Sequence, residues 1–342
     1  MQRGPRLADA DRDDPRGPLS PVRVRREPYG ETAAGAPVER WWVEGDRLRL
    51  AVLTYGARLQ SLVVPDRDGR AGDVLLALPD LAAYESDETY TGATVGRFAN
   101  RIAHGRFVLD GHEHRVPVND RGHALHGGPG GFHQRVWSAE PVGGGVRLSL
   151  ASPGGEMGFP AGLVATTTIT VAGEEVAIEH GATADAPTVV SLTQHPYFAL
   201  GGPVADQRLQ VAASRYLPVD DGSIPLGDLA PVEGTGFDVR AETEVDGSTY
   251  DHCWVLDDPG AGPAARLSDP ASGRVVELST DRPGLQVYTG DALPAPRTGL
   301  ALEAQAFPDT PNHPEWPTYG DSVLRPGETW SAVTRWRFTT DA

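Results

Sequence analysis

The sequence predicts an all-β protein with the fold class of a large antiparallel β-sandwich. Two observations support this prediction. From about Val38 onward, short runs of alternating or β-branched apolar residues are separated by Gly, Asp and Pro. Helical periodicity is nearly absent, and the 342 residues include 41 Gly and 30 Pro, which is typical of many short strands joined by turns.

The elements can be predicted in order along the chain. Residues 48–54 alternate as Leu-Arg-Leu-Ala-Val-Leu-Thr, residues 58–65 repeat the pattern, and a turn of sequence Asp-Arg-Asp-Gly-Arg follows. Asp110-Gly111 predicts a tight hairpin turn, because this pair readily adopts positive φ angles. One short helical turn is expected at residues 80–84. Further strands are expected at residues 164–171, 176–180, 189–193, 208–211, 275–279, 286–289 and 334–338.

The domain organisation follows from composition. We expect a disordered leader over residues 1–37 and a single domain over residues 38–342, since no repeat or internal linker marks a second domain. The first 26 residues are rich in Arg, Asp and Pro and lack the apolar segment of a secretory signal. A cytoplasmic location is therefore expected. The single cysteine, Cys253, excludes an intrachain disulfide and fits a reducing compartment.

Charge and hydrophobicity exclude several classes of partner. The net charge of −17 disfavours nucleic acids and anionic membranes. No stretch of the chain approaches the ~20 consecutive apolar residues that a membrane-spanning helix needs. We expect a small-molecule ligand, and a monomer or a homodimer.

Two polar blocks in the first half of the chain are candidate binding segments. In Gly96-Arg-Phe-Ala-Asn-Arg101, Asn100 and Arg101 supply donors and an acceptor that suit vicinal hydroxyls, although a solvated basic turn is an equal alternative. Residues 119–132 are rich in Gly and contain His126. No Gly-Lys-Ser/Thr follows, so a phosphate loop is excluded. His126 is either a ligand-binding or a structural histidine in a segment where missing Cβ atoms allow close approach.

Two blocks in the second half are candidates for acid–base chemistry. His195 and Tyr197 end an apolar strand, where an aromatic ring beside polar groups suits a sugar. Glu303 interrupts an apolar stretch, so its carboxyl must be paired, hydrogen-bonded or shifted toward neutrality, as a general base requires. A structural ion pair with an arginine is the alternative. Asp251 and Gln286 lie at predicted strand ends.

A functional metal is not expected. His112 and His114 flank a hairpin turn where solvent exposure explains them, and the segment after Asp66 has Ala77 where a calcium loop needs Glu.

Together these blocks resemble the aldose 1-epimerase (galactose mutarotase) family. The matching motifs, in the family's order, are GRFANRI with G-x-F-x-L-D-G, N-x-x-G-H-x-L-H-G-G-x-x-G-F, H-P-Y-F-x-L-G-G, Y-D-H, G-L-Q-V-Y-T-G and L-E-A-Q-x-F-P-D-x-x-N. The resemblance implies a single β-supersandwich domain and an enzyme without a cofactor. It implies Glu303 as general base and His195 as general acid. Its implied substrate-binding residues are Asn100, Arg101, His126, Asp251 and Gln286, with Tyr197 lining the cleft.

The implied reaction interconverts the α and β anomers of a neutral aldose such as glucose or galactose. Glu303 would remove the proton of O1 while His195 protonates O5 from the opposite side of the ring. Gln194 stands where the family usually has Asn, and Ala199 also departs from the family pattern, which bears on the sugar subsite. Two rivals remain: a hexose-6-phosphate 1-epimerase, whose phosphate Arg97 and Arg101 would bind, and a non-catalytic sugar-binding protein.

Overall fold

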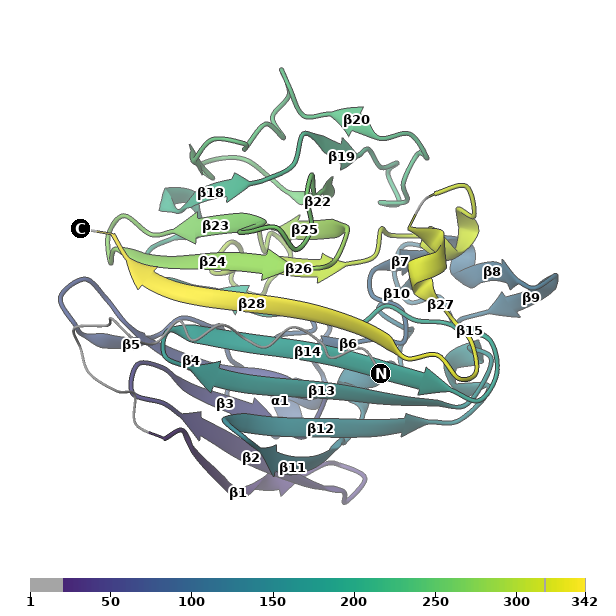
Figure 1. The fold of residues 1–342 in the computed structure, drawn as a ribbon, viewed down its shortest axis with the longest axis horizontal. Coiled ribbons are helices and arrows are strands. Elements are labelled where there is room, and N and C mark those ends of the chain that lie inside the picture. Colours follow the sequence, from purple (N-terminus) through teal and green to yellow (C-terminus); the bar gives the residue numbers. More distant parts are fainter. Residues whose placement is uncertain (1–20, 317, 342) are drawn as a thin grey trace, which may run out of the picture.

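The structure is a computed structural model that describes residues 21–316 and 318–341, and antiparallel sheets make up most of it (Figure 1). Three sheets dominate. The first has five strands in sequence order. Its strands are β1 (Arg23–Glu31), β2 (Pro37–Glu44), β3 (Arg49–Leu53), β4 (Arg58–Pro65) and β5 (Ala71–Asp73).

The second sheet has nine strands and crosses the centre of Figure 1, with the long β28 in yellow. In spatial order they are β11 (Ser138–Val142), β12 (Gly145–Ser152), β13 (Leu163–Ala172), β14 (Glu175–Ala184), β28 (Trp330–Thr340), β24 (Arg274–Thr280), β23 (Ala265–Ser268), β18 (Arg208–Val211) and β21 (Thr243–Glu244). The third sheet has six strands: β17 (Tyr197–Phe198), β26 (Leu300–Gln305), β25 (Gly284–Tyr288), β22 (Asp251–Val255), β19 (Arg215–Leu217) and β20 (Ala230–Pro231).

Short elements connect these sheets. Four two-stranded ladders pair β7 (Arg101–Ile102) with β10 (Ala124–Leu125), β6 (Thr94–Val95) with β16 (Thr193–Gln194), β8 (Arg106–Leu109) with β9 (His112–Arg115), and β15 (Thr188–Val189) with β27 (Val323–Leu324). The described residues contain one α-helix, α1 (Leu81–Glu85), capped by the Asp80 side chain. The 3₁₀ turns are Ala103–Gly105, Phe132–Gln134, Glu156–Gly158, Val204–Asp206, Thr310–Asn312 and Tyr319–Ser322.

The main core lies between the nine-stranded sheet and the other two large sheets. Alternation along each strand explains which side chains enter it. In β26, Leu300, Leu302 and Ala304 belong to this core, so Glu303 and its neighbours at odd positions face the other side. On the nine-stranded sheet, Trp336 of β28 packs edge-on against Phe198 of β17, with ring centroids 5.2 Å apart. The core therefore fixes the direction in which the polar face of the six-stranded sheet points.

Most sequence predictions of secondary structure are confirmed. The all-β class, the hairpin turn at Asp110-Gly111 and the helical turn after Asp80 are all present. The strand predicted at residues 189–193 is wrong in detail, because β15 and β16 occupy its two ends and are separate strands with different partners. Within the described residues, no helix has the length and apolar character needed to cross a membrane. The cytoplasmic location and the monomer or homodimer stay predictions.

The predicted leader over residues 1–37 is wrong for the part that the structure describes. Strand β1 (Arg23–Glu31) pairs along the whole of β2. Its polar composition resembles a disordered segment, but cross-strand contacts stabilise it: the Arg25 guanidinium lies 5.0 Å from the Trp42 ring, and Glu27 accepts a 2.7 Å hydrogen bond from Arg40. Residues 1–20 lie outside the described residues.

Candidate active site

The six-stranded sheet places four predicted site residues on one face. Gln286 of β25 pairs with Glu303 of β26, and Asp251 of β22 pairs with Tyr288 of β25. Directly paired residues in antiparallel strands share a face, and so do residues two apart along a strand. Tyr197 of β17 pairs with Ala301, so the same register places His195, two residues earlier, opposite Glu303. Local alternation and strand register together therefore assemble this half of the site.

The β7–β10 ladder brings two further blocks together. Its pairing of Leu125 with Arg101 places Asn100 beside His126. The backbone N–H of Asn100 donates to His126 Nδ1 (3.1 Å), and the N–H of His126 donates to the Asn100 carbonyl (3.1 Å). Both residues have positive φ angles, of 65° and 50°, and Gly127 follows. A Cβ atom on Gly127 would lie 2.0 Å from the Gly96 carbonyl oxygen, so only glycine permits this close approach.

All eight residues predicted from the sequence line one cavity of about 980 Å³. The structure thus brings together residues that are up to 203 positions apart. Sequence analysis missed several other lining residues; some lie within the quoted motifs at positions not singled out, and others lie on loops without a motif. Those used below are Asp87, Glu88, Thr89, Tyr90, Asp120, Arg121 and Asp291.

Glu303 and His195 form a buried pair at the base of this site. Their side chains are 2% and 5% exposed, and His195 Nε2 lies 3.5 Å from Glu303 Oε1. Burial raises the pKa of Glu303 well above its usual value, with the charge of Asp251 adding to the effect. Burial lowers the pKa of His195 to about 4. Burial therefore favours the neutral forms of both side chains, with a proton on the Glu303 carboxyl rather than on the His195 ring.

This geometry corrects one expectation. Groups whose nearest atoms are 3.5 Å apart cannot lie on opposite sides of a sugar ring. They can instead contact O1 and O5 side by side, because both oxygens are bonded to C1. Glu303 Oε2 and His195 Nδ1 have no hydrogen-bond partner among the described residues, although both are buried. Buried polar atoms without partners are unusual and indicate that this is a place where a ligand binds.

His126, His195 and Glu303 are also close enough together to hold a metal ion, since one ligand atom from each lies within 4.8 Å of the others. The hydrogen bond of His126 argues against this use. Its Nδ1 accepts from the Asn100 N–H, so the neutral ring carries its proton on Nε2. A metal needs an unprotonated ring nitrogen. Burial keeps the pKa of His126 well below its usual value, so it serves as a neutral hydrogen-bond donor toward the cavity.

Asp251 is held in one orientation by three neighbours. Gln286 Nε2 donates to its Oδ1 (2.7 Å), while Arg101 Nη2 and Arg121 Nη2 lie 3.6 and 3.8 Å from its Oδ2. Arg101 is also paired with Asp120 through a 2.8 Å contact. A fixed carboxylate at a cavity wall is suited to accept hydrogen bonds from sugar hydroxyls.

Two neighbouring positions have structural roles instead. Arg97, considered above as a phosphate ligand, is 2% exposed and does not line the cavity; its guanidinium donates to Ser152, Pro153, Pro160 and Ala161. Gln194, the departure from the family pattern, is also buried. Its amide donates to the carbonyl oxygens of Ala57 and Gly92, so it orders the backbone around the site. The interpretation of Arg97 as a phosphate ligand is therefore wrong.

Comparisons with known proteins show the family of this chain. Residues 42–337 match the family model described as aldose 1-epimerase. The chain is 37% identical to galactose mutarotase of Rattus norvegicus, over 93% of this chain and 99% of that protein. It is 36% identical to aldose 1-epimerase of Escherichia coli K12, over 84% and 91% of the two chains.

Solved structures show the same fold. The structure of galactose 1-epimerase from Lactobacillus acidophilus is similar with a TM-score of 0.83 at 26% identity, covering 94% of this chain and all of that chain. An aldose epimerase homologue from C. elegans gives a TM-score of 0.83 at 29% identity, covering 86% and 97%. The family predicted from the sequence motifs is thereby confirmed, and this chain belongs to the aldose 1-epimerase family.

Proposed function

We propose that this protein is an aldose 1-epimerase that interconverts the α and β anomers of a neutral aldose. The buried pair of Glu303 and His195, with facing atoms 3.5 Å apart in a cavity of about 980 Å³, is the observation that supports this function best. Anomer exchange needs one base and one acid that act on two oxygens of the same carbon. A protein that only binds a sugar needs neither group.

The proposed reaction opens and recloses the sugar ring. Glu303 removes the proton of O1 while His195 donates a proton to O5, so the C1–O5 bond breaks and an aldehyde forms at C1. Rotation about C1–C2 presents the other face of the aldehyde, and the two proton transfers reverse during closure. His126 Nε2–H and Arg101 would stabilise negative charge that develops at O1.

The proton held by the pair is sufficient for this cycle. Ring opening leaves Glu303 protonated and His195 neutral, which is the arrangement that burial favours in the empty site. When the ring form of the sugar binds, this proton must lie on His195 and Glu303 must be ionised. Donation from the O1 hydroxyl to Glu303 stabilises the carboxylate in that state. Substrate, rather than solvent, thus moves the proton between the two groups.

The charges around the cavity favour a neutral sugar over a phosphorylated one. Arg101 and Arg121 line it, but each is paired with Asp120 and lies near Asp251. Asp291 and Glu88 add further negative charge to the lining. A phosphate would meet two arginines that are already neutralised, and Arg97 is committed to backbone carbonyls elsewhere.

Polarimetry tests this function directly. Freshly dissolved α-D-glucose or α-D-galactose should relax to its final rotation faster in the presence of the protein. Glucose 6-phosphate should show much less acceleration, because the lining offers no unpaired cation among the described residues. Faster relaxation of the phosphorylated sugar than of both neutral sugars would contradict the proposal and favour a hexose-6-phosphate 1-epimerase.

The pH dependence of activity should follow the proton count of the pair. The active site needs one proton on Glu303 and His195 together. As pH falls toward about 4, His195 takes up a proton while Glu303 keeps its own, so kcat/KM should fall. As pH rises through the raised pKa of Glu303, the proton is lost and activity should fall again.

Asp251→Asn should sharpen this test, because the Asp251 charge raises the pKa of Glu303. Its removal should move the alkaline limb to lower pH through Glu303, and the acid limb should move in the same direction, because the Asp251 charge also raises the pKa of His195. An alkaline limb at the same pH in both proteins would count against Glu303 as the group that controls it. The rates can be measured by polarimetry in buffers of constant ionic strength.

A further inference from the structure

One wall of the cavity is a loop of residues 86–93, here called the cavity loop, which joins α1 to β6. Its first five residues, from Ser86 to Tyr90, line the cavity. Tyr90 has a φ of 56° and Gly92 a φ of 69°. A left-handed backbone is unfavourable for tyrosine and persists only where the surroundings determine it strongly. Contacts with the surrounding structure must therefore hold this loop in its conformation.

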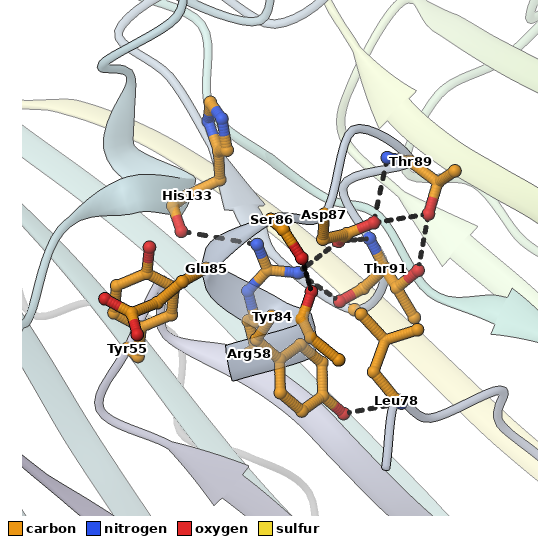
Figure 2. Close-up of polar contacts among 12 residues, drawn as sticks. Tyr55, Arg58, Leu78, Tyr84, Glu85, Ser86, Asp87, Thr89, Thr91 and His133 are labelled. Atoms are coloured by element: carbon orange, nitrogen blue, oxygen red, sulfur yellow. Dashed lines mark hydrogen bonds and ion pairs between the residues drawn. The ribbon is translucent and has the colours of Figure 1, made fainter. Parts of the chain in front are cut away.

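The loop is anchored from outside the cavity by a buried ion pair (Figure 2). Arg58 of β4 is fully buried, and its Nη1 lies 2.7 Å from Asp87 Oδ2 and donates to the Thr91 carbonyl at 2.7 Å. Asp87 also accepts from the backbone N–H groups of Thr89 (2.9 Å) and Thr91 (2.8 Å) and from the Thr89 hydroxyl. The Asp87 carboxylate thus accepts hydrogen bonds from both the loop and β4.

The same arginine contacts a second segment. Its Nη2 donates to the His133 carbonyl at 3.4 Å, and its guanidinium lies 5.1 Å from the Tyr84 ring of α1. Figure 2 shows the guanidinium between the loop, α1 and His133. A planar fork of donors can satisfy such partners at once, whereas a lysine ammonium cannot.

On its other side the loop contacts His195. The N–H of Gly92 donates to the His195 carbonyl (2.8 Å), and the N–H of His195 donates to the Ala93 carbonyl (2.8 Å). The Tyr90 ring lies 4.5 Å from the His126 ring and 6.0 Å from the His195 ring, measured between centroids. The Tyr197 hydroxyl donates to the Thr89 carbonyl (3.0 Å). Through these contacts, the positions of Arg58 and Asp87 influence the positions of the His195 backbone and ring.

We propose that Arg58 and Asp87 are positioning residues, which hold the cavity loop so that His195 faces Glu303 at reactive distance. Arg58 does not line the cavity, and the carboxylate of Asp87, which does, is taken up by Arg58, Thr89 and Thr91. This inference rests on the proposed epimerase function. A displacement of about 1 Å at a proton-transfer group can cost ~10²-fold in rate. The sugar-binding groups Asp251 and Gln286 lie on β22 and β25, outside the loop, so loss of positioning affects turnover more than binding.

The main test is Arg58→Lys, which keeps the charge but loses the fork. We expect kcat to fall by about 10- to 100-fold while KM changes much less. Arg274→Lys is the matched control, because Arg274 is a buried arginine that binds the carbonyl oxygens of Val64, Leu200 and Arg70 away from the cavity. It should lower the thermal midpoint and leave kcat unchanged below that midpoint.

A spectroscopic readout separates positioning from general destabilisation. In histidine-labelled protein, the ring signals of His126 and His195, assigned with single substitutions, should shift in Arg58→Lys and not in Arg274→Lys. A folded Arg58→Lys protein with wild-type kcat and unshifted signals would overturn the proposal. So would a loss of kcat that Arg274→Lys reproduces.

Asp87→Asn provides a second variant, should Arg58→Lys fail to fold. It keeps the shape of the side chain but removes the carboxylate charge that pairs with Arg58, so kcat should fall more than KM changes. Unchanged kcat in folded Asp87→Asn protein would overturn the proposal. If Glu303→Gln also kept full activity, the epimerase function itself would fail. If Glu303→Gln were inactive and Asp87→Asn normal, only the positioning role would fail.

Discussion

The Glu303→Gln protein should lose at least two orders of magnitude in kcat. A positioned general base typically contributes ~10²–10⁴ in rate, and glutamine has the same shape without a basic oxygen. Glu303 Oε2 is buried without a hydrogen-bond partner among the described residues, so this oxygen is open to the O1 hydroxyl of a bound sugar. Polarimetry with α-D-galactose at saturating concentration measures the effect on kcat.

The fold of this variant should remain intact. Above neutral pH, the variant should be more stable than the wild type. Burial raises the folded-state pKa of Glu303, so the wild type loses stability as pH rises above ~4.3, the value for an unfolded carboxyl, toward that folded-state pKa. Glutamine cannot ionise. Urea unfolding near pH 8 should therefore show the variant more stable than the wild type, and the difference should shrink as the pH is lowered. A folded variant with a near-normal rate would remove Glu303 from the mechanism.

His195→Asn should produce a second loss of about 10²–10⁴ in kcat, because no other group in the site can protonate O5 in its place. His126 carries its proton on Nε2, but it is fixed by the Asn100 N–H and has a pKa far below its usual value. The loss should appear in kcat, and the sugar should still bind to Asp251 and Gln286. Inhibition constants for a sugar that lacks the anomeric hydroxyl can check that binding.

His180→Asn is the matched control for this change. His180 is buried in β14, its Nδ1 lies 3.0 Å from the Thr167 hydroxyl, and burial lowers its pKa to about 3. It does not line the cavity, so its replacement should change stability without changing kcat. Equal losses of activity in the two histidine variants would show that His195 acts only through the fold.

The sequence predicted the fold class because the relevant signals are local. Alternation in residues 48–54 and 58–65 and the Asp110-Gly111 turn each depend on residues close together in the chain. Local composition was misleading at β1, where the polar residues 23–31 resemble a disordered segment. Their stability comes from pairing with β2, which composition does not report.

The sequence also predicted residues that share one cavity, since all eight predicted site residues line it. The sequence did not show which arginine lines the cavity. Arg97 and Arg101 lie in the same motif, but β7 pairing directs Arg101 toward Asp120 and Asp251, while Arg97 is buried against the segment of residues 152–161. Arg58 and Asp87 had no motif at all.

The sequence alone thus determined the strand-rich class, the family resemblance and the residue types that can transfer protons, because each is a property of short segments. The tertiary structure decided the 3.5 Å contact between His195 and Glu303, the burial that shifts both pKa values toward the neutral forms, and the anchoring of the cavity loop by Arg58. Distances, burial and choice of partner arise from pairing between residues far apart in the chain. Such pairing depends on register and packing across the whole domain, which no single segment encodes.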